Sequence, residues 1–152
     1  MSRILVNDRA GSRGIYPAPG SSSISFHSRL PGYSPTPLRE SAAAAELLGA
    51  GRVLVKDEST RFGLPAFKIL GASYAFYREL MRIGGFDDGD WSGFDELRRM
   101  CEDILPRGLV TATDGNHGRG VARTAKWCGI EAHVFVPEGT APARVGGIES
   151  EG

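Results

Sequence analysis

A lysine at the start of an apolar segment is the first residue in this sequence whose type and setting suggest chemistry. Lys68 follows Phe67 within residues 56–74 (KDESTRFGLPAFKILGASY), after a loop that contains Gly63 and Pro65. Apolar surroundings favour the neutral amine over the ammonium, and the neutral amine is the nucleophilic form. The segment therefore predicts either a reactive amine or a lysine that extends from a core helix into solvent.

A second segment, residues 111–122 (TATDGNHGRGVA), has the pattern of a strand, a glycine-rich turn and a helix. Asp114 could act as an acid or a base, and Asn116 could donate a hydrogen bond to a ligand oxygen. Three glycines would let the backbone approach a ligand closely, namely Gly115, Gly118 and Gly120. The segment does not complete G-x-G-x-x-G, so an ordinary Asp-Gly turn and an unrelated nucleotide-binding loop are both alternatives.

The elements around these two segments determine where the side chains lie. Strand and helix patterns alternate, which predicts a parallel sheet with ligands bound at the carboxyl ends of its strands. Residues 1–35, rich in proline, glycine and serine, are predicted to form an extended N-terminal arm. The predicted helices are 38–48, 67–83, 95–104, 117–128 and 142–148, and the predicted strands are 53–55, expected to be buried, 109–111 and 132–136.

Composition excludes several classes of function. The 152 residues carry 18 Lys and Arg against 18 Asp and Glu, and this balance argues against a nucleic-acid or membrane-surface binder. The sequence has no apolar run long enough to span a membrane and no signal-peptide pattern, so we expect a cytoplasmic protein. No metal site is predicted, because metal-ligand spacing is absent among His27, His117, His133, Cys101 and Cys128.

The two segments, taken in this order, resemble the fold type II pyridoxal-phosphate enzymes. The shared pattern is a Lys-x-Glu strand end, then Phe-Lys followed by Gly-Ala, then Gly-Asn-His, supplied here by Lys56 and Glu58, Phe67 and Lys68, Gly71 and Ala72, and Gly115, Asn116 and His117. Within that family, KDES-x-RFGL-x-AFK and TDGNHGRGVA are most similar to the diaminopropionate ammonia-lyases, as are LPGYSPTPL and VFVPEGTAPARV. The resemblance implies an α/β fold of the tryptophan synthase β-like kind, with an open parallel sheet in three layers.

The resemblance also implies a cofactor, pyridoxal 5′-phosphate, and roles for particular residues. Lys68 matches the lysine that forms an imine with the cofactor, and Asn116 matches the asparagine that hydrogen-bonds the pyridoxal 3′ oxygen, with Gly115 and His117 beside it. Asp114 matches a second acid or base, which favours an ammonia-lyase over the alternative of a threonine or serine dehydratase. The implied reaction converts 2,3-diaminopropionate into pyruvate and ammonia, and begins when Lys68 or Asp114 removes the Cα proton.

The resemblance covers nearly all of residues 30–148, whereas members of the family are considerably longer. The loop that holds the cofactor phosphate and the partner of the pyridine nitrogen are expected downstream of this sequence. Residues 36–152 are therefore predicted to be an incomplete cofactor-binding α/β domain with weak cofactor retention. The chain is expected to be the N-terminal part of an active lyase. The alternative is a truncated, inactive remnant of such an enzyme, or a split-gene partner that a C-terminal chain completes. The other expected partners are a small amino acid and a second copy in a homodimer.

Overall fold

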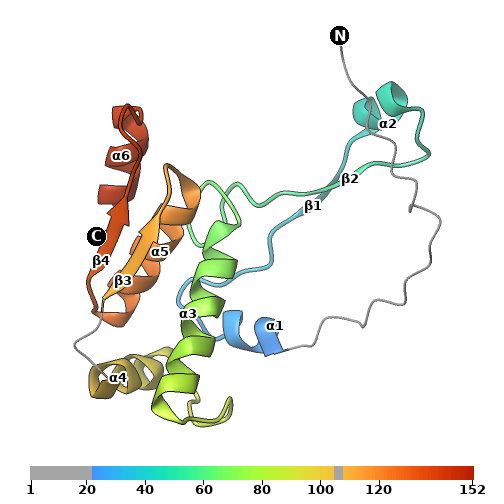
Figure 1. The fold of residues 1–152 in the computed structure, drawn as a ribbon. Coiled ribbons are helices and arrows are strands. Elements are labelled where there is room, and N and C mark those ends of the chain that lie inside the picture. Colours follow the sequence, from blue (N-terminus) through green and yellow to red (C-terminus); the bar gives the residue numbers. More distant parts are fainter. Residues whose placement is uncertain (1–21, 105–107) are drawn as a thin grey trace, which may run out of the picture.

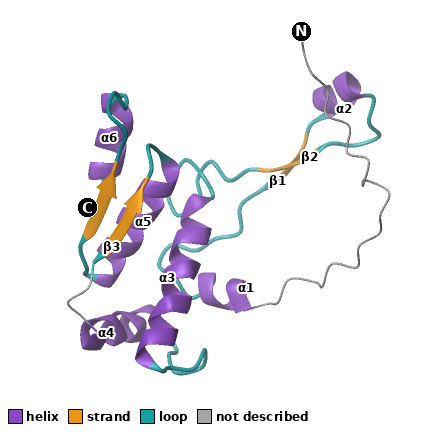
Figure 2. Ribbon diagram, viewed as in Figure 1, coloured by secondary structure: helices purple, strands orange, loops and turns teal. Residues whose placement is uncertain are grey.

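The structure of the protein, a computed structural model, describes residues 22–104 and 108–152. Figures 1 and 2 show a body of helices beside a small sheet, with a thin ribbon that projects from this body. The elements in chain order are α1 (Ser22–His27), β1 (Leu38–Glu40), α2 (Ala42–Leu48), β2 (Leu54–Lys56), α3 (Lys68–Gly84), α4 (Phe94–Ile104), β3 (Leu109–Ala112), α5 (Asn116–Cys128), β4 (Ala132–Phe135) and α6 (Pro142–Glu149).

The second half of the chain forms the predicted alternation of strands and helices. β3 and β4 pair in parallel, from Leu109 opposite Ala132 to Ala112 opposite Phe135, and α5 connects them. α5 packs on one face of this pair, whereas Val110 and Phe135 on the other face are each 67% exposed. The predicted strands 109–111 and 132–136 and the four predicted helices from residue 67 onward are confirmed to within one residue at each end.

The core lies between α1, α3, α4 and α5 and is rich in aromatic side chains. Phe26 of α1 stacks on Tyr77 of α3 with ring centroids 4.4 Å apart. The indole Nε1 of Trp91 donates to the Tyr77 hydroxyl at 3.0 Å, and the Arg29 guanidinium lies 3.6 Å from the centroid of the same indole. These contacts attach the N-terminal helix to the middle of α3, so α1 and α3 form one packed unit.

Two predictions for the N-terminal third are wrong. Residues 22–27 form helix α1, where the sequence predicted extended chain, because burial of Phe26 and His27 against α3 stabilises a helix that is too short to form alone. Residues 38–40 form β1 instead of the first turn of helix 38–48. The Ser41 side chain accepts a hydrogen bond from the Ala44 N–H at 3.3 Å, and this cap starts α2 after the strand.

The predicted buried strand at 53–55 is also wrong, because all three residues of β2 are exposed, Leu54 and Val55 by about half of their surface. β2 pairs with β1 in an antiparallel ribbon, from Leu38 opposite Lys56 to Glu40 opposite Leu54. α2 joins the two strands and has no buried residue, and Figure 1 shows the ribbon projecting away from the helical body. This part of the chain therefore forms a separate two-stranded sheet and adds no strand to β3 and β4.

The residues that the structure describes include no helix that is both long and apolar enough to cross a membrane. The same residues contain no group of three or more His, Cys, Asp or Glu side chains placed to hold a metal ion.

Candidate active site

Lys68 is the first residue of α3 and is exposed to solvent. Its Nζ atom lies 4.9 Å from the centroid of the Phe67 ring, and that ring is itself 53% exposed. The expectation of apolar surroundings for Lys68 is therefore wrong for the described part of the chain, because the neighbouring apolar side chains that are buried, such as Ile69, face the core. The lysine reaches solvent from the end of a core helix, and its amine is accessible to a ligand.

The loop that leads to Lys68 is held by a charged network that the sequence analysis missed. The Arg61 guanidinium donates to both carboxylate oxygens of Glu58, at 2.7 and 2.8 Å, and also to the Thr36 hydroxyl at 2.7 Å and the Ser34 carbonyl at 2.8 Å. The Thr36 hydroxyl donates in turn to Glu58. The hydrogen bonds from Arg61 lower the pKa of Glu58 from 4.5 to about 2, so the carboxylate stays ionised. The network joins residues 34–37 (SPTP) to the loop before Lys68.

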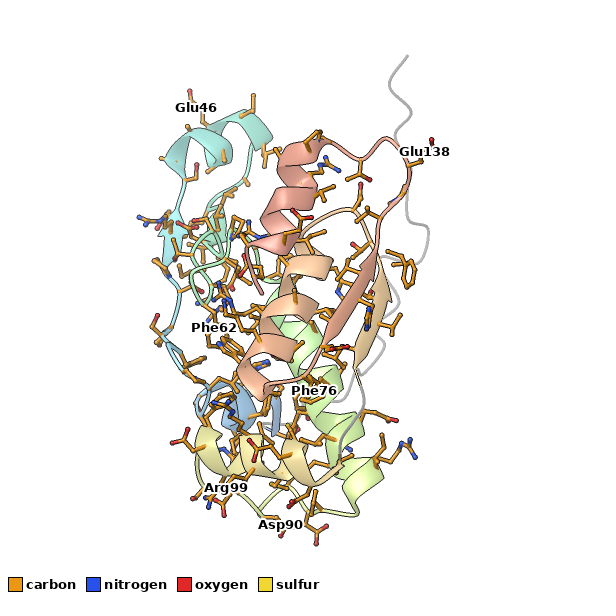
Figure 3. All side chains as sticks on the ribbon, turned by 90° about the vertical axis from the view of Figure 1, so that its left-hand side faces the viewer. Glu46, Phe62, Phe76, Asp90, Arg99 and Glu138 are labelled. Atoms are coloured by element: carbon orange, nitrogen blue, oxygen red, sulfur yellow. The ribbon has the colours of Figure 1, made fainter. Side chains whose placement is uncertain are left out.

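Phe62, next to Arg61, has a backbone conformation that side-chain-bearing residues rarely adopt. Its φ of 54° is in the left-handed region, and no other non-glycine residue in 22–104 and 108–152 shares this feature. The ring is buried and meets Trp127 of α5 edge to face at 5.4 Å, which places Phe62 beside α5 in Figure 3. The carbonyl of Phe62 accepts a hydrogen bond from Arg123 at 3.2 Å. The turn before Lys68 is thus attached to α5 by both its side chain and its backbone.

Gly118 and Gly120 have a different role from the predicted approach to a ligand. A Cβ atom added at Gly120 would lie 3.0 Å from the Cα atom of Ile69 and 3.3 Å from the carbonyl carbon of Lys68. A Cβ atom added at Gly118 would lie within 3.1 Å of side chains of Thr113, Val134 and Ile148. The absence of a Cβ atom at both glycines therefore lets α5 pack closely against the first turn of α3 at Gly120 and against three side chains at Gly118. Gly115 differs, because an added Cβ atom there would meet nothing within 4 Å.

The close approach at Gly120 brings the beginnings of α3 and α5 together. Asn116 starts α5 one helical turn before Gly120, and Lys68 starts α3 beside Gly120. Figure 1 shows both helix starts at the end of the body toward which β3 points. Lys68 and Asn116, the two residues that the sequence analysis placed at a ligand, therefore lie at the same end of the fold. This is the carboxyl end of the parallel strands, where ligands bind in open α/β sheets.

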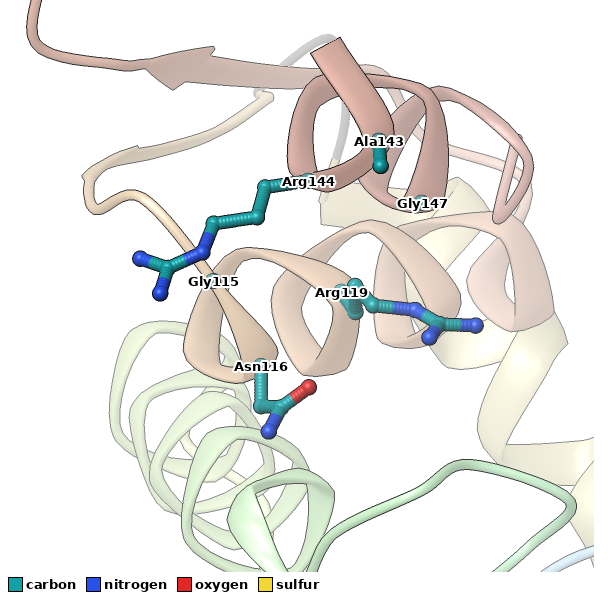
Figure 4. A pocket seen from close by; sticks show the side chains of 6 residues that line it. All are labelled: Gly115, Asn116, Arg119, Ala143, Arg144 and Gly147. Atoms are coloured by element: carbon teal, nitrogen blue, oxygen red, sulfur yellow. The ribbon is translucent and has the colours of Figure 1, made fainter. Parts of the chain in front are cut away.

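Asp114 lies between the end of β3 and the start of α5, and an arginine that the sequence analysis missed pairs with it. Arg144 of α6 donates to the Asp114 carboxylate at 2.8 Å, and the two side chains are 62% and 55% exposed. A cavity of about 340 Å³ lies beside this pair and is lined by Gly115, Asn116, Arg119, Ala143, Arg144 and Gly147. Figure 4 shows Arg144 extending from α6 toward Gly115, and Asn116 at the beginning of α5. His117, the next residue of α5, is exposed.

Comparisons with known proteins identify the family to which the chain is similar. A family model described as pyridoxal-phosphate dependent enzyme matches residues 29–152. The diaminopropionate ammonia-lyase of Salmonella typhimurium is 41% identical over 133 residues, which cover 85% of this chain and 32% of that protein. The crystal structure of Escherichia coli diaminopropionate ammonia lyase in apo form matches with a TM-score of 0.74 and 39% identity, over 86% of this chain and 35% of that chain. A catabolic L-threonine dehydratase of Staphylococcus aureus is 31% identical over 107 residues, 70% of this chain and 24% of that protein.

The chain thus spans about a third of the length of the ammonia-lyases that it matches. The structural match confirms the α/β fold class that the sequence motifs implied, and the family model accounts for both candidate segments. From its sequence, its fold and the position of Lys68 and Asn116 within them, this chain belongs to the family of pyridoxal-phosphate-dependent enzymes of fold type II.

Proposed function

We propose that this chain supplies the amine-bearing part of a pyridoxal-phosphate-dependent ammonia-lyase that acts on 2,3-diaminopropionate. The observation that carries the proposal is the position of Lys68, Asp114 and Asn116 at one end of the fold, where α3 and α5 begin. The similarity to diaminopropionate ammonia-lyases over most of this chain supports the choice of substrate. Water and 2,3-diaminopropionate would give pyruvate and two molecules of ammonia.

The side chains at this end fit the aldehyde and the ring of pyridoxal phosphate. Lys68 offers an exposed primary amine, and Asn116 offers an amide that can donate to the oxygen on the ring. Cβ atoms added at Gly71 and Gly115 would meet nothing within 4 Å, so the backbone leaves open room on both helices, and His117 flanks the same turn. When bound, pyridoxal phosphate supplies an aldehyde for the amine and a ring that withdraws electrons from the substrate carbon.

Proton transfer in this proposal uses two groups of the chain. Lys68, once its amine is free, accepts the Cα proton from one face of the substrate, and Asp114 accepts it from the other. Two bases on opposite faces allow both the D and the L isomer to react. Arg144, 2.8 Å from Asp114, keeps that carboxylate directed toward the beginning of α6 until substrate enters.

A second candidate is a chain that works only with a complementing C-terminal polypeptide, in a dimer or a split enzyme. The exposed apolar side chains favour this candidate, since Val110 and Phe135 are each 67% exposed on one face of the β3–β4 pair. The projecting ribbon of β1 and β2, whose residues are all exposed, favours it as well. We propose that residues 36–152, together with α1, which packs on α3, form the incomplete cofactor domain. Residues 1–21 of the predicted N-terminal arm lie outside the described residues.

The experiment uses the purified chain, pyridoxal phosphate and borohydride. We expect an absorbance band of the bound cofactor and, after reduction, a mass increase on the peptide that contains Lys68. The Lys68→Arg variant keeps the charge and should lose the adduct, whereas Lys56→Arg should retain it. Release of pyruvate from D- and L-2,3-diaminopropionate, with L-threonine as the competing substrate, distinguishes an ammonia-lyase from a dehydratase.

The outcomes separate the two candidates. An adduct on Lys68 together with pyruvate release supports the first candidate. An adduct or activity that appears only after addition of the C-terminal two thirds of a related ammonia-lyase supports the second. A label that is distributed over other amines and unaffected by Lys68→Arg contradicts both.

A further inference from the structure

Glu151, two residues after the end of α6, is a buried carboxylate to which the proposed reaction gives no role. Its side chain is 2% exposed. Arg119 donates to one carboxylate oxygen, Oε1, through Nε at 2.9 Å and through Nη2 at 2.5 Å. Arg123 donates to the other, Oε2, at 2.5 Å. The carboxylate is therefore bound on both oxygens by arginines that lie one turn apart on α5.

Arg123 connects this carboxylate to the loop before Lys68. Its Nη2 atom binds Glu151 and its Nη1 atom binds the Phe62 carbonyl at 3.2 Å, so one planar group bridges the two. Phe62 is the residue with left-handed backbone, a conformation that persists only where the surroundings hold it. The other side-chain hydrogen bonds beside this turn are made by Arg61, which binds Glu58 and the Ser34 carbonyl. Arg123 is thus the polar contact that fixes the turn to α5.

We propose that Glu151 is a positioning residue for Lys68, and that it acts through Arg123 and the turn at Phe62. A guanidinium without a buried anion beside it turns toward water, because solvation outweighs one hydrogen bond to a carbonyl. With Glu151 in place, Arg123 stays on the Phe62 carbonyl and the turn delivers Lys68 to the beginning of α5. The inference rests on the proposed function only in taking Lys68 as the reactive amine.

The same carboxylate also determines the direction of Arg119. The guanidinium of Arg119 binds Glu151 and, in Figure 4, points away from Asn116 and Gly115. Arg119 lines the cavity beside Asn116, and its Cδ atom lies 3.6 Å from a Cβ atom added at Gly147. One buried carboxylate therefore binds both arginines, Arg119 beside the cavity and Arg123 beside the loop before Lys68.

The test compares Glu151→Gln with Glu149→Gln. Glutamine has the shape of glutamate but a single acceptor oxygen, so it can satisfy only one of the two arginines. Glu149 lies on the last turn of α6 and its side chain is exposed, which makes it a matched control for loss of a negative charge. Two quantities are measured: amide hydrogen exchange of the turn, and the rate at which pyridoxal phosphate and borohydride label Lys68 relative to Lys56.

In Glu151→Gln we expect about tenfold faster exchange of the Gly63 and Leu64 amides, which donate within the turn at 3.1 and 3.0 Å. We also expect labelling of Lys68 to be about fivefold slower, with labelling of Lys56 unchanged. Glu149→Gln should match the unaltered protein in both measurements. If Glu151→Gln does not fold, Arg123→Lys replaces it, since an ammonium can reach Glu151 or the Phe62 carbonyl but does not bridge both.

Unchanged exchange at Gly63 and Leu64 would overturn the proposal. Faster exchange by the same factor throughout α3 and α5 would overturn it too, because that result describes a purely structural ion pair. Failure of the proposed function gives a different result, in which the unaltered protein shows no label on Lys68 although Glu151→Gln still accelerates exchange in the turn.

Discussion

Replacement of Gly120 by alanine tests the packing that brings the two candidate segments together. The added Cβ atom would lie 3.0 Å from the Ile69 Cα atom, 3.1 Å from the Ile69 nitrogen and 3.3 Å from the Lys68 carbonyl carbon. All three are backbone atoms in the first turn of α3. Because no flexible side chain can move aside, α3 itself must shift.

The size of the effect follows from two opposing contributions. Ordinary contacts of a Cβ atom begin at 3.4 Å, so the first turn of α3 must retreat by about 0.4 Å, and overpacking of this kind costs about 1–3 kcal/mol. Alanine inside a helix is about 1 kcal/mol more favourable than glycine. We therefore expect Gly120→Ala to lower the free energy of unfolding by about 0–2 kcal/mol, and Gly120→Val to lower it further.

The matched control is Gly146→Ala, since Gly146 lies within α6 and an added Cβ atom there would meet nothing within 4 Å. This variant gains the helical preference of alanine without the overlap, so it should be up to about 1 kcal/mol more stable than the unaltered protein. Urea unfolding followed by tryptophan fluorescence reports on both variants, because Trp91 is in the core. The predicted difference between the two variants is about 1–3 kcal/mol, or roughly 2–12 °C in Tm.

Gly120→Ala should also slow the labelling of Lys68 by pyridoxal phosphate and borohydride, because the shifted turn carries that amine. The reasoning is refuted if Gly120→Ala is as stable as Gly146→Ala and labels Lys68 at the rate of the unaltered protein. That pair of results would mean that the beginnings of α3 and α5 are not in close contact.

Three further predictions concern the loss of stability at low pH and the N-terminal cap of α2. Because Arg61 lowers the pKa of Glu58 to about 2, the ionised carboxylate adds stability above pH 4.5, and this stability is lost as the pH falls toward 2. In urea unfolding we expect the free energy of unfolding to fall by about 2 kcal/mol over this range. Glu58→Gln should abolish this pH dependence. Burial lowers the pKa of His27 below 6.5, so the unfolded chain gains a proton first, and stability should begin to fall as the pH drops below 6.5; His27→Gln should remove this step. Ser41→Ala removes the cap of α2 at a local cost of about 1 kcal/mol. Because α2 buries no residue, amide exchange should increase in α2 alone, and a lower unfolding midpoint of the body would contradict this.

The body of the fold could be predicted from local patterns. α3 begins three residues after Pro65 and is capped by Gly85, whose φ of 67° is typical of a left-handed helix end. The apolar spacing of α5 and the two strands that flank it predicted the parallel β3–β4 pair, because the chain between them is long enough for one crossover helix. These signals lie within each element, which is why the predicted bounds agree with the observed ones.

The ribbon and the site depended on contacts between distant residues. Leu38–Glu40 has no strand pattern of its own and becomes β1 through pairing with β2. The motif KDES-x-RFGL indicated Glu58 and Arg61 as neighbours in sequence, but their common partner Thr36 lies in the preceding motif. The exposure of Lys68 likewise depends on how α3 is oriented, and its apolar sequence neighbours gave no sign of it.

The β1–β2 ribbon is a part of the chain where residues can be inserted or deleted with little effect on the helical body. The Asp57 N–H donates to the Pro37 carbonyl at 2.9 Å, so the chain leaves the body and returns to it at the same point. Residues 38–56 are in effect an excursion between α1 and α3, closed at its base by that hydrogen bond. Since the entropy of closing a loop grows only with the logarithm of its length, insertions or deletions at the tip, near Gly49, should cost the body little. Variation among related chains can therefore accumulate at this tip without moving Lys68.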